Sequence, residues 1–265
     1  MRKLDRHVLL ALLVMAGCVR TPLANQPSPL KIETRRFERT LPGCGDSEKR
    51  EQPCFSFQVV YPEVTAAPDE EIRTRLNAQV KALLQPAGAP AGFEEEAAQL
   101  SERYSSREQH PEEEPAWFVR RTAETIHSTA AAWAVRIERT EYLGGAGANT
   151  TYDCLNLNPA TGLDIQLTDL VAPGNMEKLR AAAEARFRAE RKIPAGQRLS
   201  EAGFVFAGDQ FTLPPRFLIG KQGLVFIYAP HEITPEAQGP TYLILPWAGI
   251  EALIDRESGV VPAAE

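Results

Sequence analysis

The chain has 265 residues, of which 43% are hydrophobic and 24% charged, and its formal net charge is −6 at pH 7. It contains no low-complexity tract or internal repeat, so its composition is that of an ordinary globular protein. The acidic balance argues against nucleic acid as a partner, because a polyanion would be repelled.

The first eighteen residues have the organisation of a bacterial lipoprotein signal. A basic segment precedes the apolar run Val8–Ala16, and a lipobox ends at Cys18. The basic residues are Arg2, Lys3 and Arg6. The apolar run is shorter than the roughly 20 residues that a transmembrane helix needs. We expect residues 1–17 to be removed and Cys18 to carry acyl chains that anchor the protein. The alternative is a plain secretory signal, and both interpretations export the protein.

The segment after the signal predicts an address and a tether. Val19 follows Cys18, and no Asp stands there to indicate retention in the inner membrane, so we expect the outer membrane, facing the periplasm. Residues 18–29 are polar and contain proline, which is typical of a short stiff tether. Loss of the signal removes three basic residues and one acidic residue, so the net charge falls from −6 to −8. That charge would speed encounter with a cationic partner.

The cysteines agree with export. Cys44 and Cys54 bracket a polar insert between two strand-like segments, and we predict a structural disulfide that closes this hairpin loop. A zinc site is not expected, because no histidine or second cysteine pair accompanies them. Cys154 lies in an alternating strand pattern, which is typical of a small buried residue rather than of a nucleophile.

Periodicity predicts strands and helices in the first part of the body. Residues 31–39 are strand-like, and alternating apolar residues indicate a strand over 55–61. Pro68-Asp-Glu-Glu opens a helix. Its apolar residues at helical spacing are Ile72, Leu76, Val80 and Leu83. A second helix is expected over 93–105, and its acidic run Glu94–Glu96 is interpreted as a solvated face.

The next part is predicted to begin with two long antiparallel strands, over 117–126 and 132–142. A further strand over 150–157, a turn at 159–162 and a helix over 175–192 follow. The chain then ends with three short strands and a last helix. Their predicted ranges are 211–213, 217–219, 224–228 and 247–254.

This order of elements predicts an α+β protein, with antiparallel sheets and packed helices in two consecutive subdomains. The expected division is signal peptide 1–17, lipidated N-terminus and tether 18–29, N-terminal subdomain 30–141, C-terminal domain 142–255 and tail 256–265.

The segment Tyr142-Leu-Gly-Gly-Ala-Gly-Ala-Asn149 resembles the Tyr-x-Gly-Gly-Ala-His-x-Asn signature of the RsiV-like family, domain of unknown function 3298. Further landmarks follow in the family's order, namely Asn158, Thr161-Gly162, Leu167–Leu170, Gly223–Tyr228, Pro230–Ile233, Gly239 and Pro246. The resemblance covers about residues 142–254. Upstream, Val59–Pro62 and the helix that contains Asn77 are similar to the companion family 4163.

The resemblance implies a two-part α+β module displayed outside the cytoplasmic membrane. Some members of the family act as lysozyme-sensing anti-sigma factors, others accompany peptidoglycan deacetylase domains, and many are lipoproteins. This chain departs from the pattern at Gly147, where the family has histidine, and at His231, where it has tyrosine. The anti-sigma role is not expected, because it requires a cytoplasmic sigma-binding domain and a spanning helix.

The candidate ligand-binding residues are Tyr142, Gly144, Gly145, Asn149, His231 and Glu232. For the glycine pair, a sharp turn with positive φ is favoured over a ligand-contacting loop. A His beside a carboxylate can bind a metal or move protons, but a surface turn is the favoured interpretation of His231-Glu232.

The sequence contains no nucleophile elbow, no His-Glu-x-x-His, no phosphate-binding glycine loop and no Rossmann fingerprint. We therefore name no catalytic residue, expect no metal or cofactor, and do not favour an enzyme. Paired carboxylates for glycoside cleavage can lie far apart in sequence, so this class stays open.

Together these observations predict an exported lipoprotein that binds or senses a cell-envelope ligand. The leading ligands, taken from the resemblance, are a peptidoglycan-related glycan and a lysozyme-like protein. The alternatives are a cell-wall hydrolase or accessory to peptidoglycan modification, and a structural envelope lipoprotein.

Overall fold

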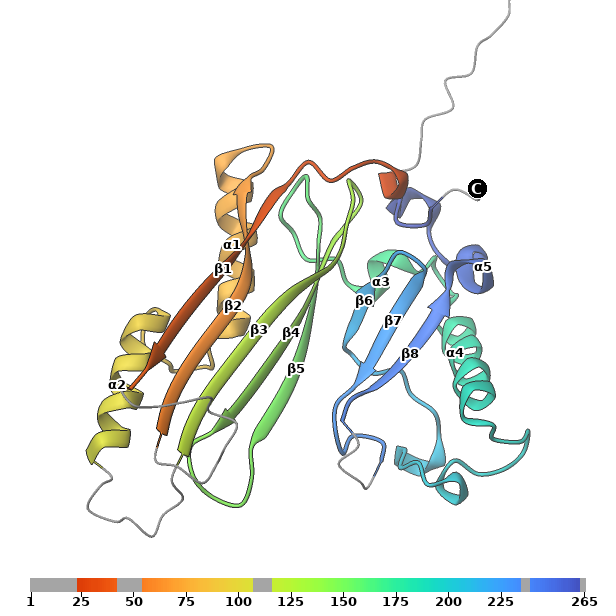
Figure 1. Cartoon of the computed structure of the whole chain (residues 1–265). Coiled ribbons are helices and arrows are strands. Elements are labelled where there is room, and N and C mark those ends of the chain that lie inside the picture. The colour runs from red at the N-terminus through yellow and green to blue at the C-terminus, as the bar shows by residue number, and fades with distance from the viewer. Residues whose placement is uncertain (1–22, 42–53, 107–115, 235–238, 263–265) are drawn as a thin grey trace, which may run out of the picture.

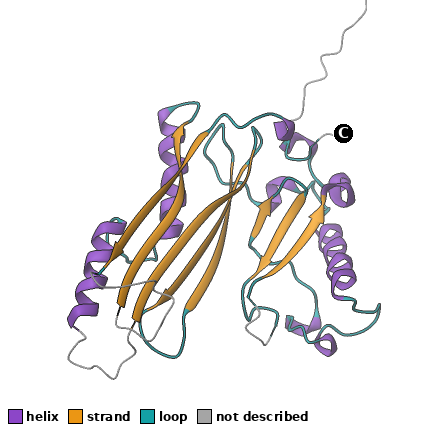
Figure 2. Cartoon of the chain, viewed as in Figure 1, coloured by secondary structure: helices purple, strands orange, loops and turns teal. Residues whose placement is uncertain are grey.

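The computed structural model describes residues 23–41, 54–106, 116–234 and 239–262. The fold is α+β, as predicted, with a five-stranded and a three-stranded sheet (Figure 1). The layers follow one another as helices, sheet, sheet and helices (Figure 2). Cys18 and Cys44 lie outside the described residues, so the lipid anchor and the Cys44–Cys54 disulfide stay predictions.

The five-stranded sheet has the order β1-β2-β3-β4-β5. Its strands are β1 (Lys31–Thr40), β2 (Cys54–Ala66), β3 (Ala116–Ser128), β4 (Trp133–Tyr142) and β5 (Asn149–Leu157). The pairs β1–β2, β3–β4 and β4–β5 are antiparallel, whereas β2 and β3 are parallel. The parallel pair arises because the chain crosses through two helices between β2 and β3.

The two helices of this crossover are α1 (Glu70–Leu84) and α2 (Phe93–Ser106). The α1 helix begins where predicted, because the Asp69 carboxylate accepts a hydrogen bond of 2.8 Å from the Ile72 N–H. Its buried face meets the apolar side of the sheet. The core there includes Leu76, Val80, Leu84, Phe55, Phe57, Val59, Val119, Val135, Ile137 and Trp133.

One side chain of α1 bonds directly to the backbone of the sheet. The Asn77 amide accepts a hydrogen bond of 2.8 Å from the Val64 N–H and donates one of 2.9 Å to the Val64 carbonyl. The pairing of β2 with β3 ends at Val60, so the Val64 N–H and carbonyl have no strand partner on that edge. The Asn77 amide satisfies both groups. This contact fixes the separation between α1 and the end of β2.

The three-stranded sheet has the order β6-β7-β8 and is antiparallel. Its strands are β6 (Phe217–Ile219), β7 (Gly223–Tyr228) and β8 (Thr241–Pro246), and its helices are α3 (Leu167–Leu170), α4 (Met176–Arg191) and α5 (Trp247–Ile250). Phe187 of α4 packs against four aromatic rings. A Cβ at residue 223 would overlap the Leu245 carbonyl, so β7 and β8 require glycine there.

Short 3-10 helices complete the described chain, at Leu23–Asn25, Ser200–Ala202, Ala207–Asp209, Glu251–Leu253 and Arg256–Ser258. Residues 23–29, which the sequence assigns to the tether, lie against the body. The Ala24 N–H donates to the Gly259 carbonyl at 2.9 Å, and Pro27 forms an isolated bridge with Thr129.

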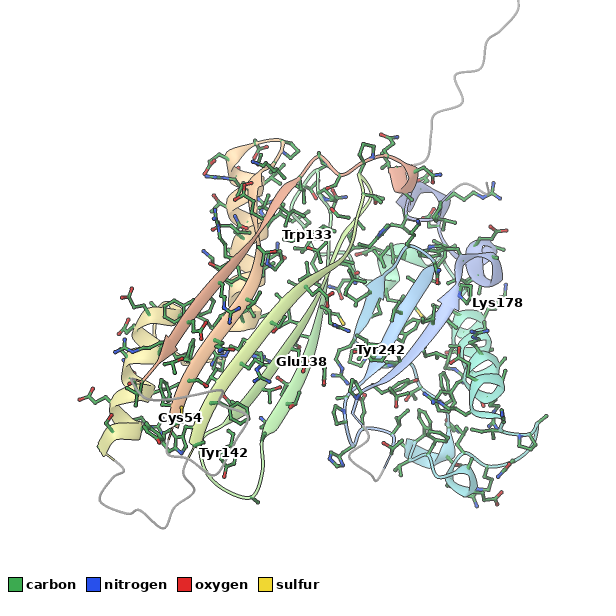
Figure 3. All side chains as sticks on the ribbon, viewed as in Figure 1. Cys54, Trp133, Glu138, Tyr142, Lys178 and Tyr242 are labelled. Carbon is green, nitrogen blue, oxygen red and sulfur yellow. The ribbon has the colours of Figure 1, made fainter. Side chains whose placement is uncertain are left out.

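The two sheets meet where the outer face of β4 and β5 contacts β6. Asn156 of β5 is 2% exposed, and its amide donates to the Phe217 carbonyl at 2.9 Å and accepts from the Ile219 N–H at 2.7 Å. The predicted subdomain boundary at residue 141 therefore falls inside the five-stranded sheet, because β5 pairs with β4. Arg136 adds a second link by donating to the hydroxyl of Tyr242, which lies between the sheets (Figure 3).

Cys154 lies in this junction, half-buried beside Ala134, Leu218 and Ile227. Burial is the main reason that the pKa of its thiol rises to about 12, with a smaller opposing effect of Arg216. The thiol is therefore un-ionised at neutral pH, which agrees with the interpretation of Cys154 as a packing residue rather than a nucleophile.

Some sequence predictions differ from the structure. Residues 211–213 form no strand, and Phe211 is instead buried in irregular backbone against Phe187. The β8 strand was not predicted. The last helix was predicted over 247–254, but α5 ends at Ile250 and a 3-10 turn follows. No helix among the described residues is long and apolar enough to cross a membrane.

We predict that Asn156→Ala lowers the free energy of unfolding by about 2–4 kcal/mol, because two buried backbone groups lose their partners. Urea unfolding measures this difference. Asn175→Ala is the control, because the Asn175 side chain contacts an exposed lysine and gives α4 no cap. Equal effects of the two substitutions would show that the Asn156 amide does not hold the sheets together.

Candidate functional site

A hollow of about 170 Å³ lies on the helix-covered side of the five-stranded sheet, near the end where β4 leads into β5. It is lined by Pro86, Arg121, Arg139, Glu141, Asn149 and Thr151. Pro86 directly follows the C-cap of α1, so the hollow begins where that helix stops covering the sheet. Asn149 is one of the six candidate residues from the sequence, and the other lining residues were not predicted.

Strand register brings these side chains together. Arg121 of β3 stands opposite Arg139 of β4, which in turn stands opposite Thr151 of β5. Two residues further along β4, Glu141 stands opposite Asn149. Alternate residues of a strand point to the same face, so all five share the face that carries the hydrophobic core.

Arg121 is a structural member of the hollow. It is 2% exposed and donates two hydrogen bonds, of 2.7 and 2.6 Å, to the Glu96 carboxylate of α2. Its guanidinium also lies 5.2 Å from the centre of the Phe57 ring. This bidentate pair satisfies both buried charges and fixes α2 on the sheet. The interpretation of Glu96 as part of a solvated face was therefore wrong, because Glu96 is 5% exposed.

Arg139 is less completely satisfied. Like charges directly opposite in a sheet repel, so its position beside Arg121 requires a compensating carboxylate. Asp153 supplies it, accepting one hydrogen bond of 2.7 Å from Nη2 of Arg139. The buried Nε of Arg139 has no acceptor among the described residues. A buried N–H without a partner costs about 1–3 kcal/mol, which an acceptor from outside the chain would recover.

The remaining polar side chains are available to a ligand. Glu141, Asn149 and Thr151 make no side-chain hydrogen bond to another described residue. Together they present a carboxylate, an amide and a hydroxyl to the same small space as Arg139. The hollow thus offers donors and acceptors side by side. Glu141 is the one carboxylate among its lining residues, and Glu96 and Asp153, which pair with its two arginines, lie beside it.

The glycine pair forms the turn between β4 and β5. Gly144 and Gly145 have φ values of 92° and 108°, which favour glycine. Tyr142 is 2% exposed, and its hydroxyl donates to the Gly145 carbonyl at 3.1 Å. These contacts support the turn interpretation for Tyr142, Gly144 and Gly145. Gly147, where the family signature has histidine, is exposed.

His231 and Glu232 lie elsewhere, in the segment after β7. Glu232 accepts hydrogen bonds from the Ala229 N–H, at 2.7 Å, and from Arg216, so its carboxylate is used within the turn. His231 is exposed with φ of 63°. The structure therefore brings Asn149 to the hollow but places His231 and Glu232 in the turn after β7. Within the described ranges, no group of three His, Cys, Asp or Glu side chains is arranged to hold a metal ion.

We predict that Glu96→Gln lowers the free energy of unfolding by about 3–5 kcal/mol, because Arg121 would stay buried without a counter-charge. The paired substitution Glu96→Leu with Arg121→Met is expected to recover much of this loss, because it removes both charges. Urea unfolding tests both, with Glu95→Gln on the exposed side of α2 as control. A loss that the paired substitution fails to recover would indicate that shape, and not charge, holds α2.

Comparisons with known proteins support the fold. No curated protein matches the chain. A crystal structure of a member of the DUF3298 family from Bacteroides fragilis NCTC 9343 is similar with a TM-score of 0.68 and 20% identity, covering 87% of this chain and 95% of the other. A DUF3298 family protein from Pseudomonas aeruginosa PAO1 is similar with a TM-score of 0.65 and 16% identity, covering 89% and 98%. The family described as "Protein of unknown function (DUF3298)" matches residues 168–248, and the chain has a fold similar to that of solved DUF3298 proteins.

Proposed function

We propose that the protein is an exported, lipid-anchored binding module for a peptidoglycan-related glycan, and that the β4–β5 hollow receives a neutral, hydrogen-bonding group of that ligand. The observation that carries the proposal is the buried Nε of Arg139, which has no acceptor among the described residues. It borders a hollow whose other free polar groups belong to Glu141, Asn149 and Thr151.

The charges of the hollow favour a neutral group. Arg121 is neutralised by Glu96 and Arg139 by Asp153, which leaves the carboxylate of Glu141 without a cation. An anionic group would be repelled by Glu141. An acetamido or hydroxyl group would offer a carbonyl or hydroxyl oxygen to Arg139 and an N–H or O–H to Glu141.

The size of the hollow indicates that it holds part of a larger ligand. Pockets for whole small molecules have volumes of about 300–1,000 Å³, and this hollow has about 170 Å³. A substituent of a glycan chain fits this description, while the rest of the chain would lie along the exposed turn between β4 and β5. The glycan is therefore favoured over a lysozyme-like protein. The main argument for such a protein is that the negative net charge of this chain would attract a cationic partner.

The hydrolase alternative receives less support. Glycoside cleavage requires two carboxyl groups that flank the scissile bond. Beside this hollow, Glu96 and Asp153 each bind an arginine, and Glu141 is the one carboxylate among the lining residues that could act on a ligand. Binding without cleavage is what this arrangement favours.

Export and anchoring rest on the lipobox that ends at Cys18. The described body begins at Leu23, five residues after Cys18. Five extended residues span at most about 18 Å. A lipid at Cys18 would therefore keep this end of the body close to the membrane surface.

Calorimetric titration of the chain from residue 19 with defined peptidoglycan fragments tests the binding proposal. We expect saturable binding at physiological salt, weakened at least tenfold by Glu141→Gln and by Asn149→Ala. Neither side chain bonds to the rest of the described chain, so the fold should be unaffected. Glu138→Gln is the control, because Glu138 lies on the opposite face of β4.

Two results would contradict the binding proposal. Fragment binding that survives both substitutions would move the site away from the hollow. Binding to lysozyme and to no fragment would favour the protein ligand instead.

The anchor has its own test. Cys18→Ser should abolish labelling with a palmitate analogue and release the protein from the membrane fraction, because the substitution removes the acylated thiol. Cys154→Ser, in which the half-buried cysteine is replaced, is the control and should label normally. Continued labelling of the Cys18→Ser variant would show that the lipobox interpretation is wrong.

A further inference from the structure

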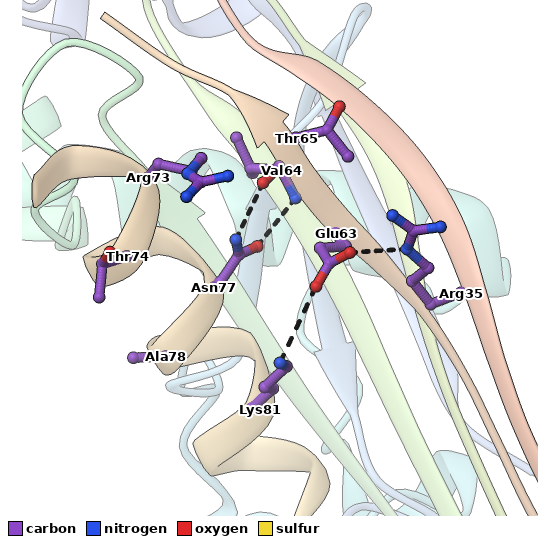
Figure 4. Close-up of a pocket in the computed structure, with 9 residues that line it drawn as sticks. All are labelled: Arg35, Glu63, Val64, Thr65, Arg73, Thr74, Asn77, Ala78 and Lys81. Carbon is purple, nitrogen blue, oxygen red and sulfur yellow. Dashed lines mark hydrogen bonds and ion pairs between the residues drawn. The ribbon is translucent and has the colours of Figure 1, made fainter. Parts of the chain in front are cut away.

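A second and larger hollow, of about 430 Å³, lies between α1 and the end of β2 (Figure 4). It is lined by Arg35, Glu63, Val64, Thr65, Arg73, Thr74, Asn77, Ala78 and Lys81. Three of these residues are cationic and Glu63 is the one carboxylate among them, so the lining carries a net charge of +2. This is the opposite sign to the whole chain, whose net charge is −6.

Carboxylates contact all three cations but leave some of their donors unused. Glu33 lies 3.5 Å from Nη2 of Arg35. Glu63 accepts a hydrogen bond of 2.6 Å from Nε of Arg35. The other Glu63 oxygen lies 3.9 Å from Nζ of Lys81, which is too long for a hydrogen bond. Arg73 makes one hydrogen bond of 2.5 Å, to Glu70 on the outside of α1. Donors of Arg35, Arg73 and Lys81 therefore remain for a ligand in the hollow.

The hollow is held open by fixed walls. Asn77, one of the lining residues, is bonded through both ends of its amide to the backbone of Val64, so α1 is held at a fixed distance from β2. Lys81 lies 5.8 Å from the centre of the Tyr61 ring, which restricts where its ammonium group can go. A site that is formed before binding loses less entropy on binding.

We propose that this hollow binds a phosphate group. A phosphomonoester carries a charge of about −1.5 to −2 at pH 7 and three strong acceptor oxygens, which can accept from the donors that Arg35, Arg73 and Lys81 leave unused. Arginine and lysine together provide the planar and the point-charge donors with which proteins bind phosphate.

The phosphate can belong to a small soluble compound or to a lipid headgroup. The hollow lies toward the end of the sheet at which the chain enters β1 and α1 begins (Figure 1). The lipid source rests on the proposed anchor, which would keep this end near a membrane. The free-phosphate source does not depend on it.

Two titrations of the chain from residue 19 test the proposal, both at physiological salt. The first uses inorganic phosphate and glycerol phosphate in a calorimeter, with added chloride at equal ionic strength as reference. The second measures flotation with phosphatidylcholine vesicles that contain or lack phosphatidic acid, whose headgroup is a phosphomonoester. We expect saturable binding in at least one arm, and the arm that responds identifies the source.

Substitutions locate the site. Arg35→Ala and Lys81→Ala should each weaken binding at least fivefold, and Arg36→Ala should change it by less than twofold. Arg36 is the matched control, because it lies on the other face of β1 and pairs with Glu38. Glu63→Gln should strengthen binding about threefold by removing the competing charge, and such a gain cannot result from misfolding.

The proposal is overturned if neither arm shows saturable binding, or if Arg36→Ala weakens binding as much as Arg35→Ala. None of these substitutions touches the β4–β5 hollow. Glycan titration of the same variants therefore separates a failure of this proposal from a failure of the proposed function.

Discussion

The position of α1 is the constraint on which the rest of the five-stranded half depends. This helix crosses the sheet and contacts β2, β3, β4 and β5, and its buried Leu76, Val80 and Leu84 form the centre of the core. A straight helix of 15 residues covers a band of a wide twisted sheet and leaves areas uncovered beside it. The two hollows lie in these areas, one beside residues 73–81 of α1 and the other at its C-terminal end.

Charged residues on the covered face separate into those whose hydrogen-bonding groups are all paired and those that keep unpaired donors. Arg121 and Glu96 satisfy each other completely in the interior, as stable burial of charge requires. Arg139 and Lys81 differ, because each has donors that no nearby carboxylate accepts. Arginine and lysine side chains on this face thus differ in how many of their hydrogen-bond donors have an acceptor. This number is a better guide to function than residue type.

Periodicity predicted the strands and helices where one face is apolar and the other polar. It succeeded for α4, whose Leu179, Ala183 and Phe187 are buried, and for β3 with β4. It failed at Phe211, because a buried aromatic residue can lie in irregular backbone. The parallel pairing of β2 with β3 was not predictable from local pattern. The same is true of the hollows, because the residues that line them meet through register and crossover. Charged residues at inward positions of β3 and β4 were the available signal.

The family match and the proposed sites occupy different parts of the chain. Residues 168–248 contain α4 and the three-stranded sheet, whereas both hollows lie on the five-stranded sheet outside this segment. The two solved DUF3298 proteins nevertheless cover 87% and 89% of this chain. The similarity of fold therefore extends to the five-stranded sheet. A sheet that keeps its shape while its sequence diverges can vary its polar lining residues independently of its core. In this chain the junction through Asn156 and the glycine at 223 hold the frame, whereas the proposed ligand contacts of Glu141, Asn149, Arg35 and Lys81 lie apart from it.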